Sequence, residues 1–206
     1  MTIENYITSS CLISRNVIYK NGKALFENKI EGPPAFFLAA YHYFNISYPK
    51  FYKMDNLCKL GLLGTEILLA GNPLSYKPQE TGVVIANSNA SLDTDIRYYK
   101  TTDDIASPAL FVYTLPNIVI GEICIRHNIK GENAFFVTEK FDPRFIEQYV
   151  TNLFNNNILQ ACICGWVEIL DEEYKTVLFL VEKKAGIPVI PFTKENINKI
   201  YQSDNG

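Results

Sequence analysis

The sequence has no long apolar run and no cluster of basic residues, and each absence excludes a class of protein. No stretch of membrane-span length is continuously apolar, and no apolar run follows a basic start as in a signal peptide. The formal net charge is -3 and the lysines are scattered, so no positive field for nucleic acid is expected. The sequence therefore predicts a cytoplasmic protein that neither spans a membrane nor binds nucleic acid.

The cysteines form neither a disulfide framework nor a metal-binding pattern. Their number, 5, is odd, and their spacing matches no zinc motif. Cys162 and Cys164 stand two apart in an apolar run, so on a strand both would point to one face as buried thiols. We expect reduced cysteines, no metal and no other cofactor.

The composition predicts one well-packed domain. The chain has 206 residues, of which 48% are hydrophobic, and it contains 13 Phe and 13 Tyr. A chain of this length removes about 70% of its unfolded surface from water on folding. The sequence therefore has the apolar content for a large core, and disorder is not expected outside the ends.

Local signals in the first half predict strands, a hairpin and one long helix. A strand is expected over 6–14, and Asn21-Gly22 is a strong signal for a tight hairpin turn within 16–29. A helix over 54–70 can be capped by Asp55. Its Gly61 and Gly64 favour close packing onto a sheet.

The rest of the chain alternates apolar strands with capped helices. Strands are expected over 81–87, 134–137 and 159–170, and helices near residues 93, 108 and 118. Asp142-Pro143 predicts a helix start. After a turn at 171–173, the segment 175–183 returns as an antiparallel strand. The pattern predicts an α/β fold.

A series of short motifs within 107–167 carries a family resemblance. These motifs are Ser107-Pro108, Leu115-Pro116-Asn117, Gly121-Glu122-Ile123, Ile129-Lys130-Gly131 and the apolar run that ends at Gly165. Their order and spacing resemble the β-ketoacyl synthases of the thiolase-like superfamily. The resemblance implies half of a thiolase-like fold: a mixed, mostly parallel sheet with helices on both faces and a C-terminal antiparallel hairpin. It implies a ketosynthase N-terminal-like domain over 1–190 and a C-terminal tail over 191–206.

The resemblance places the nucleophile of that family at a lysine. In the family a Thr-Ala-Cys motif carries the cysteine that attacks the acyl thioester. Here Thr138 matches the threonine, but Glu139 and Lys140 replace Ala-Cys, with Lys140 nine residues after Gly131. An amide formed on lysine would not transfer its acyl group onward, so no catalytic residue is expected. Lys140 is interpreted as an exposed loop lysine, and a nucleophile or base of depressed pKa is the alternative.

The histidines and the helix over 143–156 also depart from the active family. The family's second half carries two histidines that bind the thioester carbonyl, whereas this chain has only His42 and His127, and neither matches them. In active relatives the corresponding helix is apolar and rich in small residues. In this chain the segment 143–156 is instead amphipathic, with one apolar and one polar face. We therefore expect a naturally short protein adapted to the loss of the second half.

Two other candidate sites are weaker. Cys124 and His127 stand three apart on an expected helix and could form a nucleophile pair, although a packed core thiol is the favoured interpretation. The aspartates 93, 95, 103 and 104 lack the spacing of a calcium loop. They are interpreted as helix caps and solvated loop residues.

The strand at 134–137 is the expected interface. In ketosynthases this strand pairs antiparallel with its copy across the dimer axis. The interface residues are thus Ala134, Phe135, Phe136, Val137 and Thr138. We expect a dimer, either with itself or with a full-length ketosynthase, and acyl carrier protein as a further candidate partner.

Three functions follow from these observations. The first is a non-catalytic accessory or structural partner in fatty-acid, aryl-polyene or polyketide-type synthesis. The second is a thioester-acting enzyme, a 3-oxoacyl-carrier-protein synthase or a malonyl decarboxylase. The third is a homodimeric binding module.

Overall fold

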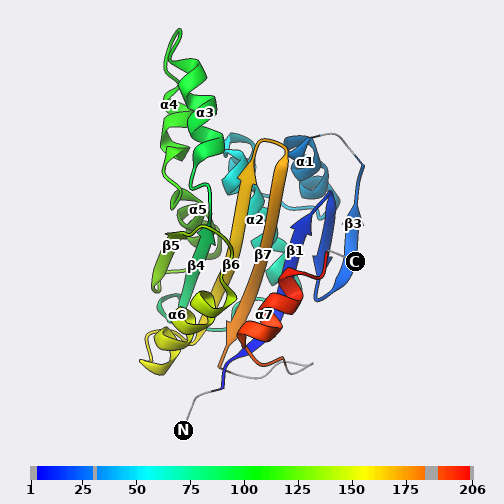
Figure 1. Cartoon of the computed structure of the whole chain (residues 1–206), viewed down its shortest axis with the longest axis vertical. Helices are drawn as coiled ribbons and strands as arrows, with labels where there is room; N and C mark the ends of the chain where they lie inside the picture. The colour runs from blue at the N-terminus through cyan, green and yellow to red at the C-terminus, as the bar shows by residue number, and fades with distance from the viewer. Residues whose placement is uncertain (1–3, 30–31, 184–189, 205–206) are drawn as a thin grey trace.

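A computed structural model describes residues 4–29, 32–183 and 190–204, which form one sheet covered by helices (Figure 1). The strands are β1 (Tyr6–Ser14), β2 (Val17–Lys20), β3 (Lys23–Glu27), β4 (Thr81–Asn87), β5 (Asn133–Val137), β6 (Ala161–Leu170) and β7 (Glu173–Glu182). The helices are α1 (Pro33–Tyr43), α2 (Asn56–Leu69), α3 (Leu92–Thr101), α4 (Pro108–Phe111), α5 (Ile118–His127), α6 (Pro143–Asn155) and α7 (Lys194–Tyr201). Short 3-10 helices cover Pro49–Lys53, Pro78–Glu80 and Val112–Thr114.

The sheet is mixed, and its strand order is β3-β2-β1-β7-β6-β4-β5. The α/β class, the helices on both faces and the C-terminal hairpin β6–β7 are confirmed. The expectation of mostly parallel pairing is corrected: β4 runs parallel to β5 and β6, while β1–β2, β2–β3, β1–β7 and β6–β7 are antiparallel. The cause is local for three of these four pairs, because strands joined by tight turns, as in β1–β2–β3 and β6–β7, pair antiparallel. The β1–β7 pair joins strands far apart in the sequence.

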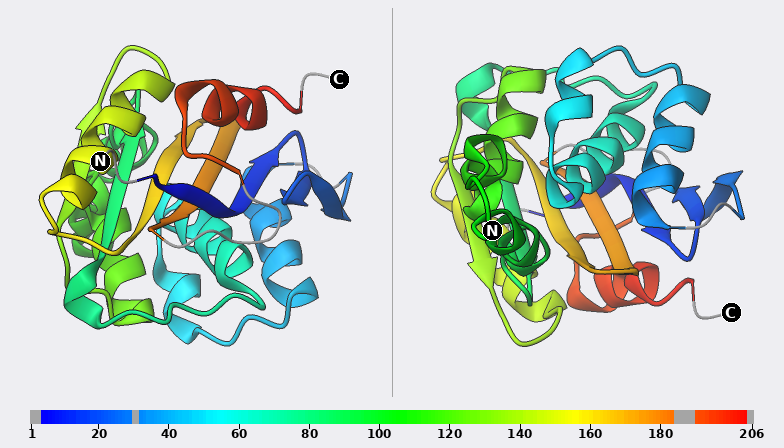
Figure 2. Two further views of the ribbon diagram at one scale, coloured as in Figure 1. Left: turned by 90° about the horizontal axis from the view of Figure 1, so that it is seen from below. Right: turned by 90° about the horizontal axis from the view of Figure 1, so that it is seen from above.

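Two helical layers enclose the sheet (Figure 2). Helices α1, α2 and α5 cover one face, and their core residues pack with Val83 and Ile85 of β4. Helices α6 and α7 cover the other face, where the core includes Val84 and Ala86 of the same strand. Every residue of β4 is buried, as predicted from its continuous apolar sequence.

The two glycines of α2 allow close packing. A Cβ atom added at Gly64 would lie 3.1 Å from side-chain atoms of Leu178 and Thr176 on β7. One added at Gly61 would lie 2.4 Å from the Cγ2 atom of Val119 on α5. The predicted contact with the sheet is therefore correct for Gly64, and Gly61 serves the contact between two helices.

The segment expected to be a C-terminal tail is packed against the domain in its described part. Thr193 caps α7 by accepting a hydrogen bond from the Asn196 amide, and Ile197 is fully buried in the second core. Beyond the helix, the Asp204 carboxylate lies 2.7 Å from the Lys175 ammonium and accepts a hydrogen bond of 2.7 Å from the Ser14 hydroxyl. These contacts join the end of the described chain to β1 and β7.

Within the described ranges, no single helix is long and apolar enough to cross a membrane. The bent pair Pro108–Thr114 and Ile118–His127 passes that test only when its two helices are taken together, and they meet at 96°.

Candidate functional site at the end of strand β5

Strand β5 lies at the edge of the sheet, where it pairs only with β4 among the described strands. Phe135 packs against the first core and Phe136 against the second. The Phe136 ring lies 4.8 Å from the ring of Phe145 and 4.9 Å from that of Tyr149, both on α6. The two phenylalanines thus anchor the strand on both faces of the sheet. Val137, 57% exposed, ends the strand beside an open edge.

Lys140 lies in the exposed turn between β5 and α6. The Thr138 amide donates to the Asn87 carbonyl at 2.9 Å, and the Thr138 hydroxyl donates to the Lys140 carbonyl at 3.1 Å. Asp142 caps α6 by accepting hydrogen bonds from the Arg144 and Phe145 amides. The turn is therefore ordered by its own residues, and the Lys140 side chain extends into solvent.

The groups that could activate a nucleophile lie elsewhere. His127 ends α5, and the chain then passes through β5 before it reaches Lys140, so His127 and Lys140 lie at opposite ends of that strand. His42 is exposed near the end of α1. Neither imidazole approaches the turn in the described structure.

The surroundings of the cysteine thiols do not favour a reactive thiolate. All five cysteines are free. Burial raises the pKa of the Cys11 thiol to about 12 and that of the Cys124 thiol to about 11. The second value argues against a Cys124–His127 nucleophile pair, because an activated thiol needs a depressed pKa. Cys124 packs against the first core, and the carboxylate near His127 is that of Glu66, at 3.5 Å.

Asp93 and Asp95 lie in the first turn of α3, where the N-cap residue is Ser91, so the interpretation as helix caps is wrong for these two residues. Asp93 is buried, and its carboxylate accepts hydrogen bonds from the Asn56 side-chain amide and the Asp171 backbone amide. The Asp95 carboxylate accepts from the Ser91 hydroxyl. Within the described ranges, no three His, Cys, Asp or Glu side chains gather to hold a metal ion.

A projecting arm, residues 92–115, extends beyond the same end of the sheet (Figure 1). It contains α3, α4 and the 3-10 turn that follows. Its exposed large apolar side chains are Leu92, Ile96, Tyr99, Ile105, Phe111, Val112 and Leu115, of which Ile105 is 79% exposed. Large apolar side chains that gather on a surface are typical of protein interfaces. The sequence did not reveal this surface, because an apolar residue in a helical segment is usually a core residue.

Carboxylate contacts fix the loop that leads into the arm. Glu168 on β6 accepts hydrogen bonds from the Ser88 amide at 2.5 Å, the Ser88 hydroxyl at 2.6 Å and the Asn89 side-chain amide at 3.1 Å. In addition, the Thr94 hydroxyl donates to the buried carboxylate of Asp55, which caps α2. The arm therefore has a rigid base at the end of β4, next to the end of β5.

Helix α6 is amphipathic, as predicted. Ile146, Val150, Leu153 and Phe154 are buried against the sheet. The opposite face, with Arg144, Gln148, Asn152 and Asn155, is exposed. The outer face of α6 is therefore polar and exposed to solvent.

Comparisons with known proteins identify solved structures that share the fold of this chain. No protein-family model matches the chain, and no curated protein matches it. Solved structures do match. The ishigamide ketosynthase/chain length factor is 18% identical with a TM-score of 0.64, and the match covers 87% of this chain and 62% of that one.

Two further structures agree with the first. The complex of the ketosynthase ApeO with its chain length factor ApeC from Xenorhabdus doucetiae matches with 13% identity and a TM-score of 0.56, over 89% of this chain and 80% of that one. AntDE:AntF, a type II polyketide-synthase acyl-carrier protein in complex with its ketosynthase, matches with 11% identity and a TM-score of 0.58, over 88% and 63%. The chain therefore shares the fold of these ketosynthase structures, and it spans about three fifths of the length of two of these three matched chains.

Proposed function

We propose that this chain is a non-catalytic ketosynthase-like subunit that pairs with a full-length ketosynthase in fatty-acid, aryl-polyene or polyketide-type synthesis. The observation that carries the proposal is Lys140. The resemblance in the sequence puts it in the place of the nucleophilic cysteine, and it lies in an exposed turn. The proposal requires no cofactor.

The surroundings of Lys140 support a role without acyl transfer. A thioester-exchanging site needs a thiolate and donors that hold the substrate carbonyl. No cysteine lies in the turn, and the helix that follows has its first amides capped by Asp142. His127 lies beyond the other end of β5.

The surface beside Lys140 supports a protein partner. The open edge of β5, with Ala134, Phe135, Phe136, Val137 and Thr138, can accept another strand. The exposed apolar residues of the projecting arm lie at the same end of the sheet.

The solved structures support the kind of partner. Two of the matched structures are ketosynthase and chain length factor assemblies, and the third contains an acyl-carrier protein. In the ApeO–ApeC complex, 89% of this chain matches 80% of the other, so those two chains are similar in length. A short ketosynthase-like chain in such an assembly is the arrangement proposed here.

The test is the native mass of the tagged protein purified from its own source, with mass spectrometry of what accompanies it. A stoichiometric full-length ketosynthase is the expected companion. Val137→Lys, which places a charge at the open edge, should release the partner, while Lys140→Ala should retain it. A clean homodimer of twice 23.4 kDa would instead favour the homodimeric binding module.

A separate assay addresses the enzymatic alternative. The purified protein is incubated with malonyl-carrier protein, and decarboxylation and acyl loading are followed by mass spectrometry. We expect neither. Turnover that Lys140→Ala abolishes would refute the non-catalytic role and support a thioester-acting enzyme.

A further inference from the structure

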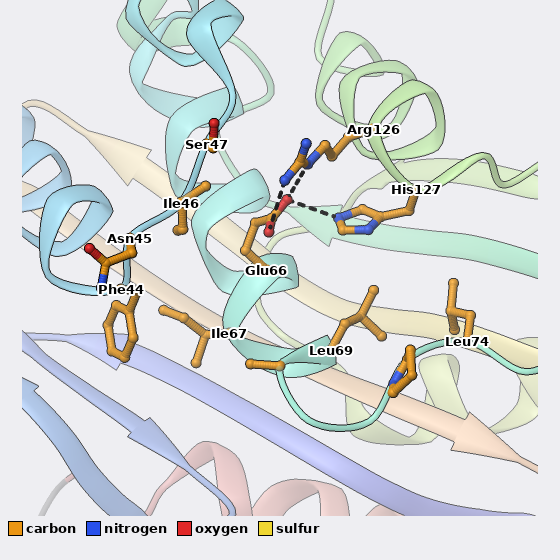
Figure 3. A pocket seen from close by; sticks show the side chains of 12 residues that line it. Phe44, Asn45, Ile46, Ser47, Glu66, Ile67, Leu69, Leu74, Arg126 and His127 are labelled. Atoms are coloured by element: carbon orange, nitrogen blue, oxygen red, sulfur yellow. Dashed lines mark hydrogen bonds and ion pairs between the residues drawn. The ribbon is translucent and has the colours of Figure 1, made fainter.

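A pocket whose lining does not include Lys140 lies in the helical layer of α1, α2 and α5 (Figure 3). It is formed by the C-terminal ends of α2 and α5 and by the segment that follows α1. Its volume is about 680 Å³. This value is within the range of about 300–1,000 Å³ for sites that hold small molecules.

Most of the pocket wall is apolar. The apolar wall consists of Phe44, Ile46, Ile67, Leu69, Pro73 and Leu74. Figure 3 shows Phe44, Ile46 and Ile67 on one side of Glu66 and Arg126 and His127 on the other, with Leu69 and Leu74 below the polar pair. The pocket thus has an apolar region and a polar end, and its occupant should be amphipathic.

The polar end contains an ion pair between two helices. The Glu66 carboxylate on α2 accepts hydrogen bonds from Arg126 on α5, at 2.5 Å from Nε and 3.5 Å from an Nη atom. The Arg126 guanidinium also lies 4.9 Å from the centre of the Tyr48 ring. The two charges cancel. A guanidinium has five N–H groups, so Arg126 keeps donors beyond those directed at Glu66.

His127 supplies the second polar group. Its side chain is 15% exposed, and its Nε2 atom lies 3.5 Å from a Glu66 oxygen. That atom makes no hydrogen bond within the described residues. Burial, aided by Arg126, lowers the pKa of His127 against the opposing effect of Glu66, which favours the neutral imidazole. A buried polar atom without a hydrogen bond is costly, and a ligand could supply the missing partner.

We propose that this pocket binds a small uncharged amphiphile whose head, a primary amide or an alcohol, both donates and accepts a hydrogen bond. The head lies between His127 and Arg126: it donates to the imidazole and accepts from the guanidinium. The body of the ligand covers the apolar wall. A charged head is disfavoured because Glu66 and Arg126 already neutralise each other, and a further buried charge would lack a partner.

The test is titration of the full chain with hexanamide, followed by NMR of the imidazole signals. The chain has 2 histidines, so the spectrum is simple, and His42 is an internal control because it is exposed and outside the pocket wall. We expect saturable shifts of the His127 signals and none of the His42 signals. Hexanoate and hexylamine, which have the same body and a charged head, should bind at least tenfold more weakly.

Two variants separate the pocket from other sites. Leu74→Trp fills the apolar region and should abolish the shifts of the His127 signals. His127→Phe keeps a ring of similar size but removes the hydrogen bond. It should weaken hexanamide binding about tenfold, measured on the backbone amide signals of Ile67 and Leu74. Circular dichroism checks that each variant is folded, and Ile158→Ala, at an exposed residue outside the pocket wall, is the control without effect.

Three results would overturn the proposal. The first is the absence of any saturable shift with hexanamide. The second is equal binding to the Leu74→Trp variant, which would place the ligand elsewhere. The third is hexanoate binding as tightly as hexanamide, which would show that the polar end selects an anion. None of these results bears on the proposed pairing with a ketosynthase, which is tested by co-purification.

Discussion

The same substitution should have opposite effects at two helical glycines. Gly61 on α2 faces α5, and a Cβ atom there would lie 2.4 Å from Val119 Cγ2. Val119 is itself fully buried, and its branched side chain has few alternative rotamers in a helix. In contrast, a Cβ atom at Gly121 on α5 would meet nothing within 4 Å. The two sites therefore share the helical conformation and differ in packing.

The expected magnitudes follow from packing and backbone entropy. Gly61→Ala should lower the free energy of unfolding by about 1–3 kcal/mol, because α2 and α5 must move apart to admit the methyl group. Gly121→Ala should raise it by about 0.5–1 kcal/mol, because alanine restricts the unfolded chain and favours the helix. For a protein of this size, each kcal/mol shifts the melting temperature by about 2–4 °C.

Urea unfolding followed by circular dichroism measures both changes. The slope of the free energy against urea should be the same in both variants, which would show that the midpoint alone has moved. Stabilisation by Gly61→Ala, or equal destabilisation at the two sites, would refute the account of close packing between α2 and α5. Gly121→Ala makes the same glycine-to-alanine change in a helix. A difference in stability between the two variants therefore cannot be attributed to helix propensity.

Three further predictions concern the ends of the second helical layer. Ile197→Ala empties a fully buried position in α7 and should cost about 2–5 kcal/mol by urea unfolding, or release α7 alone, which amide hydrogen exchange would reveal. Burial acts to raise the pKa of Asp204, but the hydrogen bonds from Lys175 and Ser14, together with the Lys175 charge, outweigh it and hold that pKa below its usual value. Its stabilising effect is therefore present above about pH 4 and is lost as the pH falls through the lowered pKa, so Asp204→Asn should be less stable than wild type at pH 7 and approach it near pH 3 in urea unfolding. Asp142→Ala removes the cap of α6 and should cost about 1 kcal/mol in the same assay, and an unchanged midpoint would contradict the role of the cap.

Local signals in the sequence predicted most of the elements. Asn21 and Gly22 both adopt positive φ in the turn between β2 and β3, as the Asn-Gly signal requires. Asp55 caps α2 and Asp142 caps α6, as predicted. Turns and caps can be predicted from the sequence because each depends on a few adjacent residues whose side chains form hydrogen bonds with the nearby backbone.

Features that depend on distant residues were not predictable in this way. The place of β1 between β2 and β7 depends on contacts with a strand more than 160 residues away. The helix α7 has a mostly polar sequence, and its single fully buried residue, Ile197, gives no periodic signal. The Glu66–Arg126 pair joins residues 60 positions apart. Each of these requires the tertiary structure before it can be seen.

The fold also explains why glycines of the ketosynthase-like motifs are fixed while the residue at position 140 is not. A Cβ atom at Gly131 would lie 2.3 Å from the Thr81 carbonyl oxygen, and one at Gly165 would lie 2.0 Å from the Val177 carbonyl oxygen. Gly165 also has a φ of 147°, which disfavours any side chain. These glycines are required for strands and turns to approach, whatever the protein does. Lys140 is exposed, so packing does not restrict the residue there. Motifs made of such glycines therefore predict the fold, whereas the fold leaves position 140 free to vary.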